Sequence, residues 1–190
     1  MKTFVFGGSG HAREVEWLIT EINKTKKNKI LIYCFVVHDS DFVADVNINN
    51  IPLISESDYF EKYHQATLHN CIIAIGSGPL RRKIVNKIRS NKTIFPNLIH
   101  PSVIMDQRSV SFGEGLILCA GTILTANISL GNFTHINVSV TIGHDTKISD
   151  FVTISPGVSI AGNVIVHSDC FIGIGAKIIE NVEIVKDLSF

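Results

Sequence analysis

Residues 136–160 read INVSVT-IGHDTK-ISDFVT-ISPGVS-I when they are written in groups of six, and each group opens on isoleucine. The same position is Leu, Ile or Val in all twelve repeats from Leu118 to Ile184. A period of six matches neither the 3.6-residue turn of a helix nor the seven-residue repeat of a coiled coil. It indicates a solenoid, in which each repeat stacks on its neighbours and shares their core.

This period predicts a triangular coil in which six residues form one flat face and one corner, so that eighteen residues complete a turn. The aliphatic residue points inwards. The residue after it is often small, as at Gly131, Gly143 and Gly173, and we expect it to permit the tight corner. Twelve units then give four coils at a spacing of about 4.8 Å. Phe112 continues the series upstream.

The first half of the chain alternates strand and helix patterns instead. The predicted strands are residues 3–6, 30–37 and 71–75. The first predicted helix is residues 11–22, and a short second helix runs from the Ser55-Glu56-Ser57-Asp58 capping box to Tyr63. A third helix begins at Pro79 and has the apolar stripe Leu80, Ile84, Val85 and Ile88. Such alternation indicates a small parallel sheet with right-handed crossovers. We therefore expect a Rossmann-like α/β domain over residues 1–97 and an all-β coil domain over residues 98–190.

Composition excludes several classes of protein. The 190 residues carry no formal net charge, which disfavours nucleic-acid binding because that function needs a basic surface. The longest apolar run, Ile30–Val37, is too short to span a membrane. The N-terminus reaches glycines too early for a signal peptide, and the four cysteines are scattered without a C-x-x-C pair. We expect a cytoplasmic protein without disulfides or a metal; His135 and His167 beside His144 do not reproduce a metal-binding pattern.

Gly8-x-Gly10, between a strand and a helix, can present backbone amides and the positive end of a helix dipole to a phosphate. The full dinucleotide fingerprint needs a third glycine at position 13, where this chain has Arg13, so a plain tight turn is the alternative. Asp39 follows the second strand, as does the acid that binds the ribose in such folds.

His144 lies two positions after the inward-pointing Ile142, so its side chain should face outwards at or near a corner. An imidazole can act as a general base near neutral pH, and the adjacent Asp145 can fix its tautomer and stabilise the imidazolium. The alternative is an ordinary surface histidine.

Together these motifs resemble the NeuD/PglD-type sugar O-/N-acetyltransferases, which are hexapeptide-repeat acyltransferases with a left-handed β-helix. The resemblance rests on Gly7-Gly8-Ser9-Gly10-His11, Ala74-Ile75-Gly76, Leu98-Ile99-His100-Pro101 and the coils from Asn137 to Gly175. It implies a homotrimer with donor clefts between adjacent subunits, acetyl-CoA along the coils, and the acceptor's nucleotide on the N-terminal domain. The family's catalytic base is a histidine followed by an acid, which correspond to His144 and Asp145.

The resemblance also implies ligand contacts. The nucleotide-linked sugar would contact Ser9, Gly10, His11, Asp39 and Gly76, with Arg81 either on a phosphate or simply exposed on its helix. His38 replaces a second acid that the family often has, which leaves the nucleotide base open. CoA would contact Thr153, Ala161, Gly173 and Ile174, where Thr153 replaces a second histidine. The family's additional glycine-rich turn and Gly-x-Pro-Ala-Lys tail have no counterpart before Leu188-Ser189-Phe190, which suggests weaker CoA binding as a hypothesis.

The function that this resemblance implies is acetyl transfer from acetyl-CoA to the amine of a nucleotide-linked 4-amino-4,6-dideoxy sugar, for bacterial surface-glycan biosynthesis. One alternative keeps the fold and makes sialic acid or another sugar hydroxyl the acceptor. An alternative of another class is a non-catalytic trimeric binding or scaffold protein.

Overall fold

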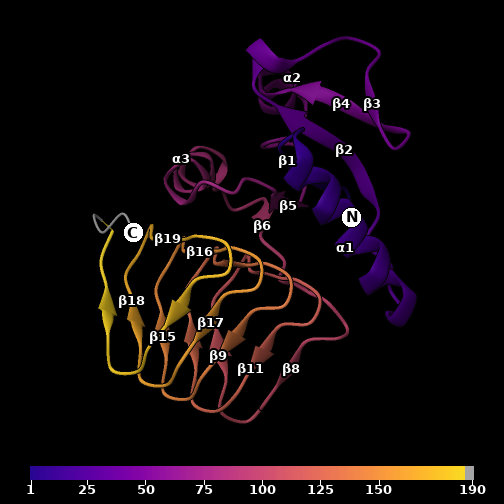
Figure 1. The fold of residues 1–190 in the computed structure, drawn as a ribbon. Helices are drawn as coiled ribbons and strands as arrows, with labels where there is room; N and C mark the ends of the chain where they lie inside the picture. Colours follow the sequence, from indigo (N-terminus) through magenta and orange to yellow (C-terminus); the bar gives the residue numbers. More distant parts are fainter. Residues whose placement is uncertain (187–190) are drawn as a thin grey trace. The chain divides into compact units, whose positions relative to one another are not determined.

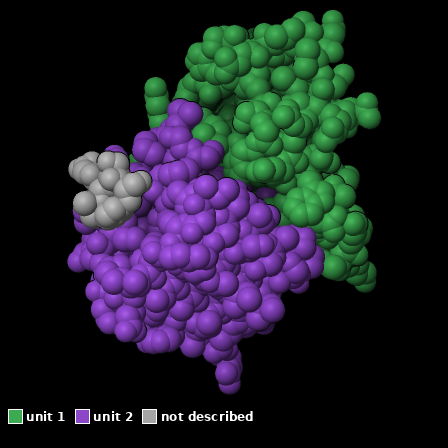
Figure 2. All heavy atoms as spheres, viewed as in Figure 1, with its two compact units in different colours: residues 1–75, 82–96 green, residues 76–81, 97–190 purple. Residues whose placement is uncertain are grey.

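The computed structural model describes residues 1–186, and these form two compact units, which Figure 2 shows in different colours. Unit 1 comprises residues 1–75 and 82–96; unit 2 comprises residues 76–81 and the chain from Asn97 onwards. The segment 76–81 thus belongs with the coils, although it precedes the expected boundary at residue 97. The segment Leu188-Ser189-Phe190, on which the hypothesis of weaker CoA binding rests, lies outside the described residues. Within residues 1–186, no helix is long and apolar enough to cross a membrane.

Unit 1 contains a six-stranded sheet with the strand order β3-β4-β2-β1-β5-β6 (Figure 1). Its elements are β1 (Thr3–Phe6), α1 (Gly10–Thr25), β2 (Ile32–Val37), the 3₁₀ helix η1 (Asp39–Asp41), β3 (Asn47–Ile48), β4 (Ile51–Ser55), α2 (Glu56–Lys62), β5 (His69–Ile73), α3 (Gly78–Ile88) and β6 (Thr93–Ile94). The predicted parallel pairing holds for five strands, but β3 pairs antiparallel with β4. The chain reverses there because Asn49 and Asn50 both adopt positive φ, as a two-residue hairpin turn requires.

The helices of unit 1 confirm most of the sequence pattern. Helix α1 buries the predicted positions Ala12, Val15, Leu18, Ile19 and Ile22. The Ser55 hydroxyl accepts a hydrogen bond from the Asp58 amide at 3.1 Å and caps α2, as predicted. The predicted stripe of α3 is wrong at Leu80, which is 46% exposed, whereas Arg81 beside it is fully buried. The buried face of α3 runs through Arg81 because that side chain reaches backbone carbonyls of the coils.

Unit 2 is a left-handed parallel β-helix of two-residue strands. The first sheet contains β7 (Leu98–Ile99), β10 (Ile117–Leu118), β13 (His135–Ile136), β16 (Thr153–Ile154) and β19 (Phe171–Ile172). The second sheet contains β8 (Ile104–Met105), β11 (Ile123–Leu124), β14 (Thr141–Ile142), β17 (Ser159–Ile160) and β20 (Lys177–Ile178). The third sheet contains β9 (Ser111–Phe112), β12 (Ser129–Leu130), β15 (Lys147–Ile148), β18 (Ile165–Val166) and β21 (Glu183–Ile184). The coils stack in register, as Figure 1 shows.

Residues 98–184 make five coils, so the expectation of four coils is wrong by one. The first coil was hidden because one step, between Met105 and Phe112, spans seven residues. From Leu118 to Ile172 every inward aliphatic residue is at most 5% exposed, as predicted. Each such side chain contributes about 1.5–3 kcal/mol through burial. This stack of Leu, Ile and Val is the core of unit 2.

The corners differ from the sequence interpretation. The left-handed residue is the third after the inward aliphatic residue, and it recurs every six residues from Gly115 to Asn181 with φ between 53° and 72°. The glycine directly after the aliphatic residue has another role. A Cβ on Gly131 would lie 2.5 Å from the Asp150 amide nitrogen, and one on Gly143 would lie 2.6 Å from the Ala161 carbonyl carbon. These positions are small because the next coil passes directly over them.

Because the coil repeats every eighteen residues, the left-handed residues form three columns. The Phe corner, which leads into the first sheet, comprises Gly115, Phe133, Phe151 and Asp169; the Gly/Ser corner, which leads into the second, comprises Gly121, Ser139, Gly157 and Gly175; the Asn/Asp corner, which leads into the third, comprises Asn127, Asp145, Asn163 and Asn181.

Candidate active site

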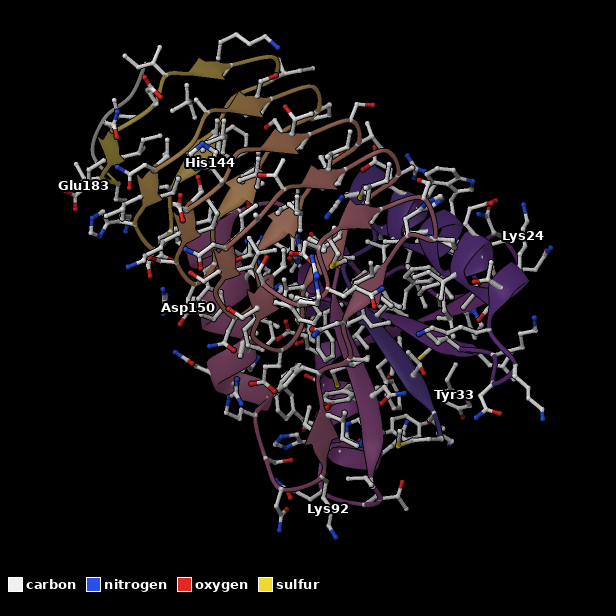
Figure 3. The ribbon with its side chains drawn as sticks, turned by 90° about the horizontal axis from the view of Figure 1, so that it is seen from below. Lys24, Tyr33, Lys92, His144, Asp150 and Glu183 are labelled. Carbon is white, nitrogen blue, oxygen red and sulfur yellow. The ribbon has the colours of Figure 1, made fainter. Side chains whose placement is uncertain are left out.

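His144 lies at the Asn/Asp corner, directly after strand β14 (Figure 3). Ile142 points into the core and is 1% exposed, while the His144 side chain is 66% exposed, so the imidazole faces outwards as predicted. The buried Thr146 fixes the backbone beneath it, because its hydroxyl donates to the Ala161 carbonyl at 3.2 Å. The corner therefore holds an accessible imidazole on a rigid coil.

Asp145 binds the imidazole of His144: its Oδ2 lies 2.8 Å from the histidine Nδ1. Its Oδ1 accepts a hydrogen bond from Nδ2 of Asn127, one coil back, at 2.6 Å. The bond from Asn127, and after it the bond from His144, lower the pKa of the Asp145 carboxyl below its ordinary value. With Nδ1 donating to this carboxylate, Nε2 carries the lone pair and is the atom that can accept a proton.

Gly162 lies one coil beyond His144, and the imidazole packs against its α-carbon. A Cβ at this position would lie 2.7 Å from both Cε1 and Nε2 of His144. Sequence analysis identified neither Gly162 nor Asn127. The signal was the eighteen-residue turn: Gly162 is eighteen residues after His144, and Asn127 is eighteen residues before Asp145.

The glycine loop of unit 1 lies between β1 and α1. Gly7 adopts φ of 124°, and its α-carbon lies so near the Ala74 carbonyl oxygen that a Cβ would come within 2.6 Å of it. Ser9 is the N-cap of α1 without a side-chain cap bond, and the first turn of α1 has no acidic residue. His11 Nδ1 lies 3.1 Å from Oε2 of Glu14. A sixteen-residue helix beginning here can direct its positive dipole end at a phosphate.

Two charged residues lie on elements next to this loop: Asp39 follows β2, the strand that pairs with β1, and Arg13 lies in α1. The Asp39 carboxylate accepts a hydrogen bond from the Ser57 amide at 3.1 Å, and bonds from Ser57 lower the pKa of Asp39. The Asp39 side chain is exposed, and one of its carboxylate oxygens is occupied by the amide at the start of α2. Arg13 stands where the dinucleotide fingerprint has a glycine, and a Cβ on Gly10 would lie 3.8 Å from its guanidinium. The departure from the fingerprint therefore places a cation beside the loop.

Gly76 and Arg81, both expected at the nucleotide-linked sugar, lie together with Thr153, which is expected at CoA. Arg81 donates to the Gly76 carbonyl at 3.2 Å and to the Thr153 hydroxyl at 3.0 Å, and that hydroxyl donates to the Gly76 carbonyl at 2.6 Å. Arg81 also donates to the carbonyls of Phe133 at 2.8 Å and of Phe151 and Val152 at 3.1 Å.

Arg81 is fully buried, which corrects the expectation that it is simply exposed on its helix. Burial lowers the pKa of its guanidinium to about 9, the negative charge of Asp169 opposes that shift, and the group remains charged at neutral pH. Its hydrogen bonds to backbone carbonyls make it a structural residue. The Thr153 hydroxyl belongs to the same network, because it bonds both Arg81 and Gly76.

The chain is similar to known proteins in both of its units. Residues 2–88 match the family model of the PglD N-terminal domain. GDP-perosamine N-acetyltransferase of Escherichia coli O157:H7 is 25% identical over 94% of this chain and 78% of its own length.

Two solved structures are similar over nearly the whole chain. The first is a histidine-to-asparagine mutant of perosamine N-acetyltransferase from Caulobacter crescentus in complex with CoA and GDP-perosamine, at 25% identity and a TM-score of 0.82, covering 96% of this chain and 82% of that one. The second, WeeI from Acinetobacter baumannii AYE, is 27% identical with a TM-score of 0.74 and covers 99% and 93%. These relatives extend the likeness from the PglD N-terminal domain into the coils.

The match to the PglD N-terminal domain ends with the last residue of α3, Ile88. The positions predicted for CoA lie beyond it and do not share one corner. Ala161 follows β17 at the Asn/Asp corner, beside the coil of His144. Gly173 and Ile174 follow β19 at the Gly/Ser corner, where Ile174 is 78% exposed. Thr153, the remaining predicted CoA contact, lies on β16 in the network of Arg81, so the described coils separate these positions into three places.

The histidines of the coils lie in different surroundings. His135 lies beside the buried guanidinium of Arg81, with its Nδ1 3.3 Å away, and His167 pairs with Glu183 at the third sheet. Within residues 1–186, no group of three or more His, Cys, Asp or Glu residues could hold a metal ion.

Proposed function

We propose that this protein transfers the acetyl group of acetyl-CoA to the 4-amine of a nucleotide-linked 4-amino-4,6-dideoxy sugar, with His144 as the general base. The observation that carries the proposal is the exposed imidazole, whose Nδ1 is paired with Asp145 so that Nε2 is the proton acceptor. Perosamine N-acetyltransferase, a relative of this chain, binds CoA and GDP-perosamine.

The reaction needs one proton acceptor and two positioned substrates. The amine nitrogen attacks the thioester carbonyl, and a C–N bond forms while Nε2 of His144 takes the proton from the nitrogen. The tetrahedral intermediate then collapses, the C–S bond breaks, and the imidazolium returns its proton to the CoA thiolate. Asp145 stabilises the imidazolium in between without accepting the proton itself. The largest contribution expected from the protein is holding the amine and the thioester in reacting geometry.

The nucleotide of the acceptor belongs, in this proposal, at the glycine loop of the PglD N-terminal domain. The start of α1 would bind a phosphate, with Ser9, Gly10 and His11 nearest to it, and Arg13 is a more suitable cation than the buried Arg81. Asp39 would bind the ribose or the base through its second carboxylate oxygen, since its first accepts the Ser57 amide.

A cytoplasmic homotrimer with donor sites between subunits completes the proposal. His144 lies on an open corner, and a donor site needs a second wall that excludes water. Outward-facing isoleucines support such an assembly: Ile104 is 64% exposed on the second sheet, and Ile165 is 37% exposed on the third. Acetyl-CoA would lie along these coils, near Ala161 at the corner of His144.

The proposal is tested by following release of free CoA thiol with acetyl-CoA and a panel of UDP-, dTDP- and GDP-linked 4-amino sugars, with sialic acid alongside. We expect turnover with one amino sugar and a loss of about 100-fold or more in His144→Ala, whose melting temperature should match the wild type. Turnover of sialic acid alone would make the enzyme an O-acetyltransferase. No turnover with any acceptor, from a folded protein, would favour the scaffold alternative.

A further inference from the structure

The Asn/Asp corner connects the candidate base to its neighbouring coils. Asn127, Asp145, Asn163 and Asn181 occupy it at intervals of eighteen residues, all with φ between 54° and 61°. Asparagine and aspartate tolerate this left-handed conformation better than other residues with a Cβ. Backbone geometry therefore explains the residue types, and the side-chain contacts distinguish one member of the column from another.

Asn127 is the member that reaches the histidine pair. Its Nδ2 donates to Oδ1 of Asp145 at 2.6 Å, and the other oxygen of the same carboxylate contacts Nδ1 of His144 at 2.8 Å. The carboxylate is thus held at both oxygens. If the bond from Asn127 is removed, the Asp145 carboxylate can rotate about χ2, a torsion with broad minima. The imidazole of His144 then loses a partner of fixed orientation.

Asn127 is itself anchored to the coil behind it. Its backbone amide donates to the Ser109 hydroxyl at 3.0 Å, and that hydroxyl donates to Oδ2 of Asp106 at 2.9 Å. The donor is therefore part of a chain of hydrogen bonds that runs through three successive coils to His144.

We propose that Asn127 is a positioning residue for His144, acting through Asp145. Its side chain fixes the carboxylate, and the carboxylate holds the imidazole with Nδ1 protonated and Nε2 ready to accept a proton. The inference rests on the proposed function for its catalytic consequence, whereas the tautomer it predicts is a property of the protein without substrate.

Among the four residues of the Asn/Asp corner, Asp145 is the carboxylate, while Asn127, Asn163 and Asn181 are neutral amides. The imidazole of His144 is the titratable group that contacts it. Lys147 opens the following strand β15, and Glu180 lies two coils beyond His144 in the same column. Asp106 behind Ser109 is paired with Arg108 at 3.0 Å. The hydrogen bond from Asn127 is thus the contact that distinguishes Asp145 from an ordinary surface carboxylate.

Asn163 provides a matched control. It has the same corner geometry, with φ of 55°, and its Nδ2 makes the same kind of bond, to Oδ1 of Asn181 at 2.6 Å. Asn127→Gly and Asn163→Gly each remove one such bond and relieve the same backbone conformation. Asn127→Asp and Asn163→Asp keep the side-chain size and remove the donor. They also add a negative charge, which lies beside a second carboxylate only in Asn127→Asp, so the glycine pair is the comparison without a charge change.

The experiment measures the ring ¹⁵N shifts of His144 in the full-length protein without substrate, together with kcat and KM. Both Asn127 variants should shift His144 away from the Nδ1–H tautomer and lower kcat about three- to tenfold, with KM within about twofold. Both Asn163 variants should keep the wild-type tautomer. Equal ring shifts in the Asn127 and Asn163 variants would overturn the positioning role. If the tautomer changes as expected but even the wild type is inactive, the proposed function fails and the positioning role stands.

Discussion

The Phe corner and the Asn/Asp corner have the same backbone but different surroundings. The angle φ lies between 53° and 59° at Phe133 and Phe151 as well as at Asn127 and Asp145. The two phenylalanines are nevertheless buried, with their rings stacked and the ring centroids 5.1 Å apart, whereas Asn127 and Asp145 are exposed. At the Phe corner the carbonyls accept bonds from buried Arg81; at the Asn/Asp corner the side chains bond one another and His144. The repeat determines the corner, and the side chains on it determine whether the corner is structural or chemical.

If the Phe corner is structural, removing its cation should produce the largest loss of stability. Arg81→Leu removes the guanidinium that donates to the carbonyls of Phe133 and Phe151, so we expect the free energy of unfolding to fall by about 3–5 kcal/mol. Chemical denaturation followed by circular dichroism measures this. Arg108→Leu is the control, because that arginine is 91% exposed, and its unfolding midpoint should not change measurably. Equal midpoints for the two variants would contradict the structural role.

At the Asn/Asp corner, a change in shape should affect activity more than stability. Gly162→Ala places a Cβ 2.7 Å from the imidazole, so the exposed ring must swing away from its position; we expect kcat/KM to fall about tenfold with a small change in melting temperature. In the His144→Ala background the same substitution has no ring to displace, so any thermal cost should disappear. A cost that persists there would show that the added methyl group disturbs the coil itself.

The smallest expected effect is on the pH dependence of Asp145. Asn127 makes the largest contribution to its lowered pKa, so Asn127→Gly should raise that pKa towards the ordinary value for aspartate. A carboxyl with a lowered folded-state pKa stabilises the fold above its unfolded pKa, and that stabilisation disappears as the pH falls through the folded pKa. As the pH falls, Asn127→Gly should therefore lose this stabilisation at a higher pH than the wild type does. NMR titration of the Asp145 carboxyl carbon measures the shift, and an unchanged midpoint would argue against the Asn127 bond in solution.

Much of this arrangement was predictable from local pattern. The six-residue period predicted the coils, the inward aliphatic residues and the outward direction of His144, because each depends on residues close together in the chain. The surroundings of Arg81 were not predictable. Its carbonyl partners at Phe133 and Phe151 lie 52 and 70 residues away, and a carbonyl is present in every residue, so no sequence signal distinguishes them.

Asn127 and Gly162 represent an intermediate case. Both are found by counting eighteen residues from the histidine pair, once the coil length is known. Their meaning still required coordinates, since Asn163 obeys the same spacing and bonds Asn181 instead of the acid. The first coil was missed for a related reason: a single seven-residue step at Met105–Phe112 interrupts the period without interrupting the stack.

The eighteen-residue turn also limits how this chain can change in length. A one-residue insertion between Asn127 and Asp145 would move the asparagine out of the acid's column, although the seven-residue step in the first coil is accommodated. Removal of eighteen residues takes out one whole coil. Every residue after the deletion keeps its corner, and only the identity of the preceding coil changes. Whole coils are therefore the natural unit of insertion and deletion in this β-helix, and residues 127–162 form the stretch whose length must be conserved for His144 to keep both neighbours.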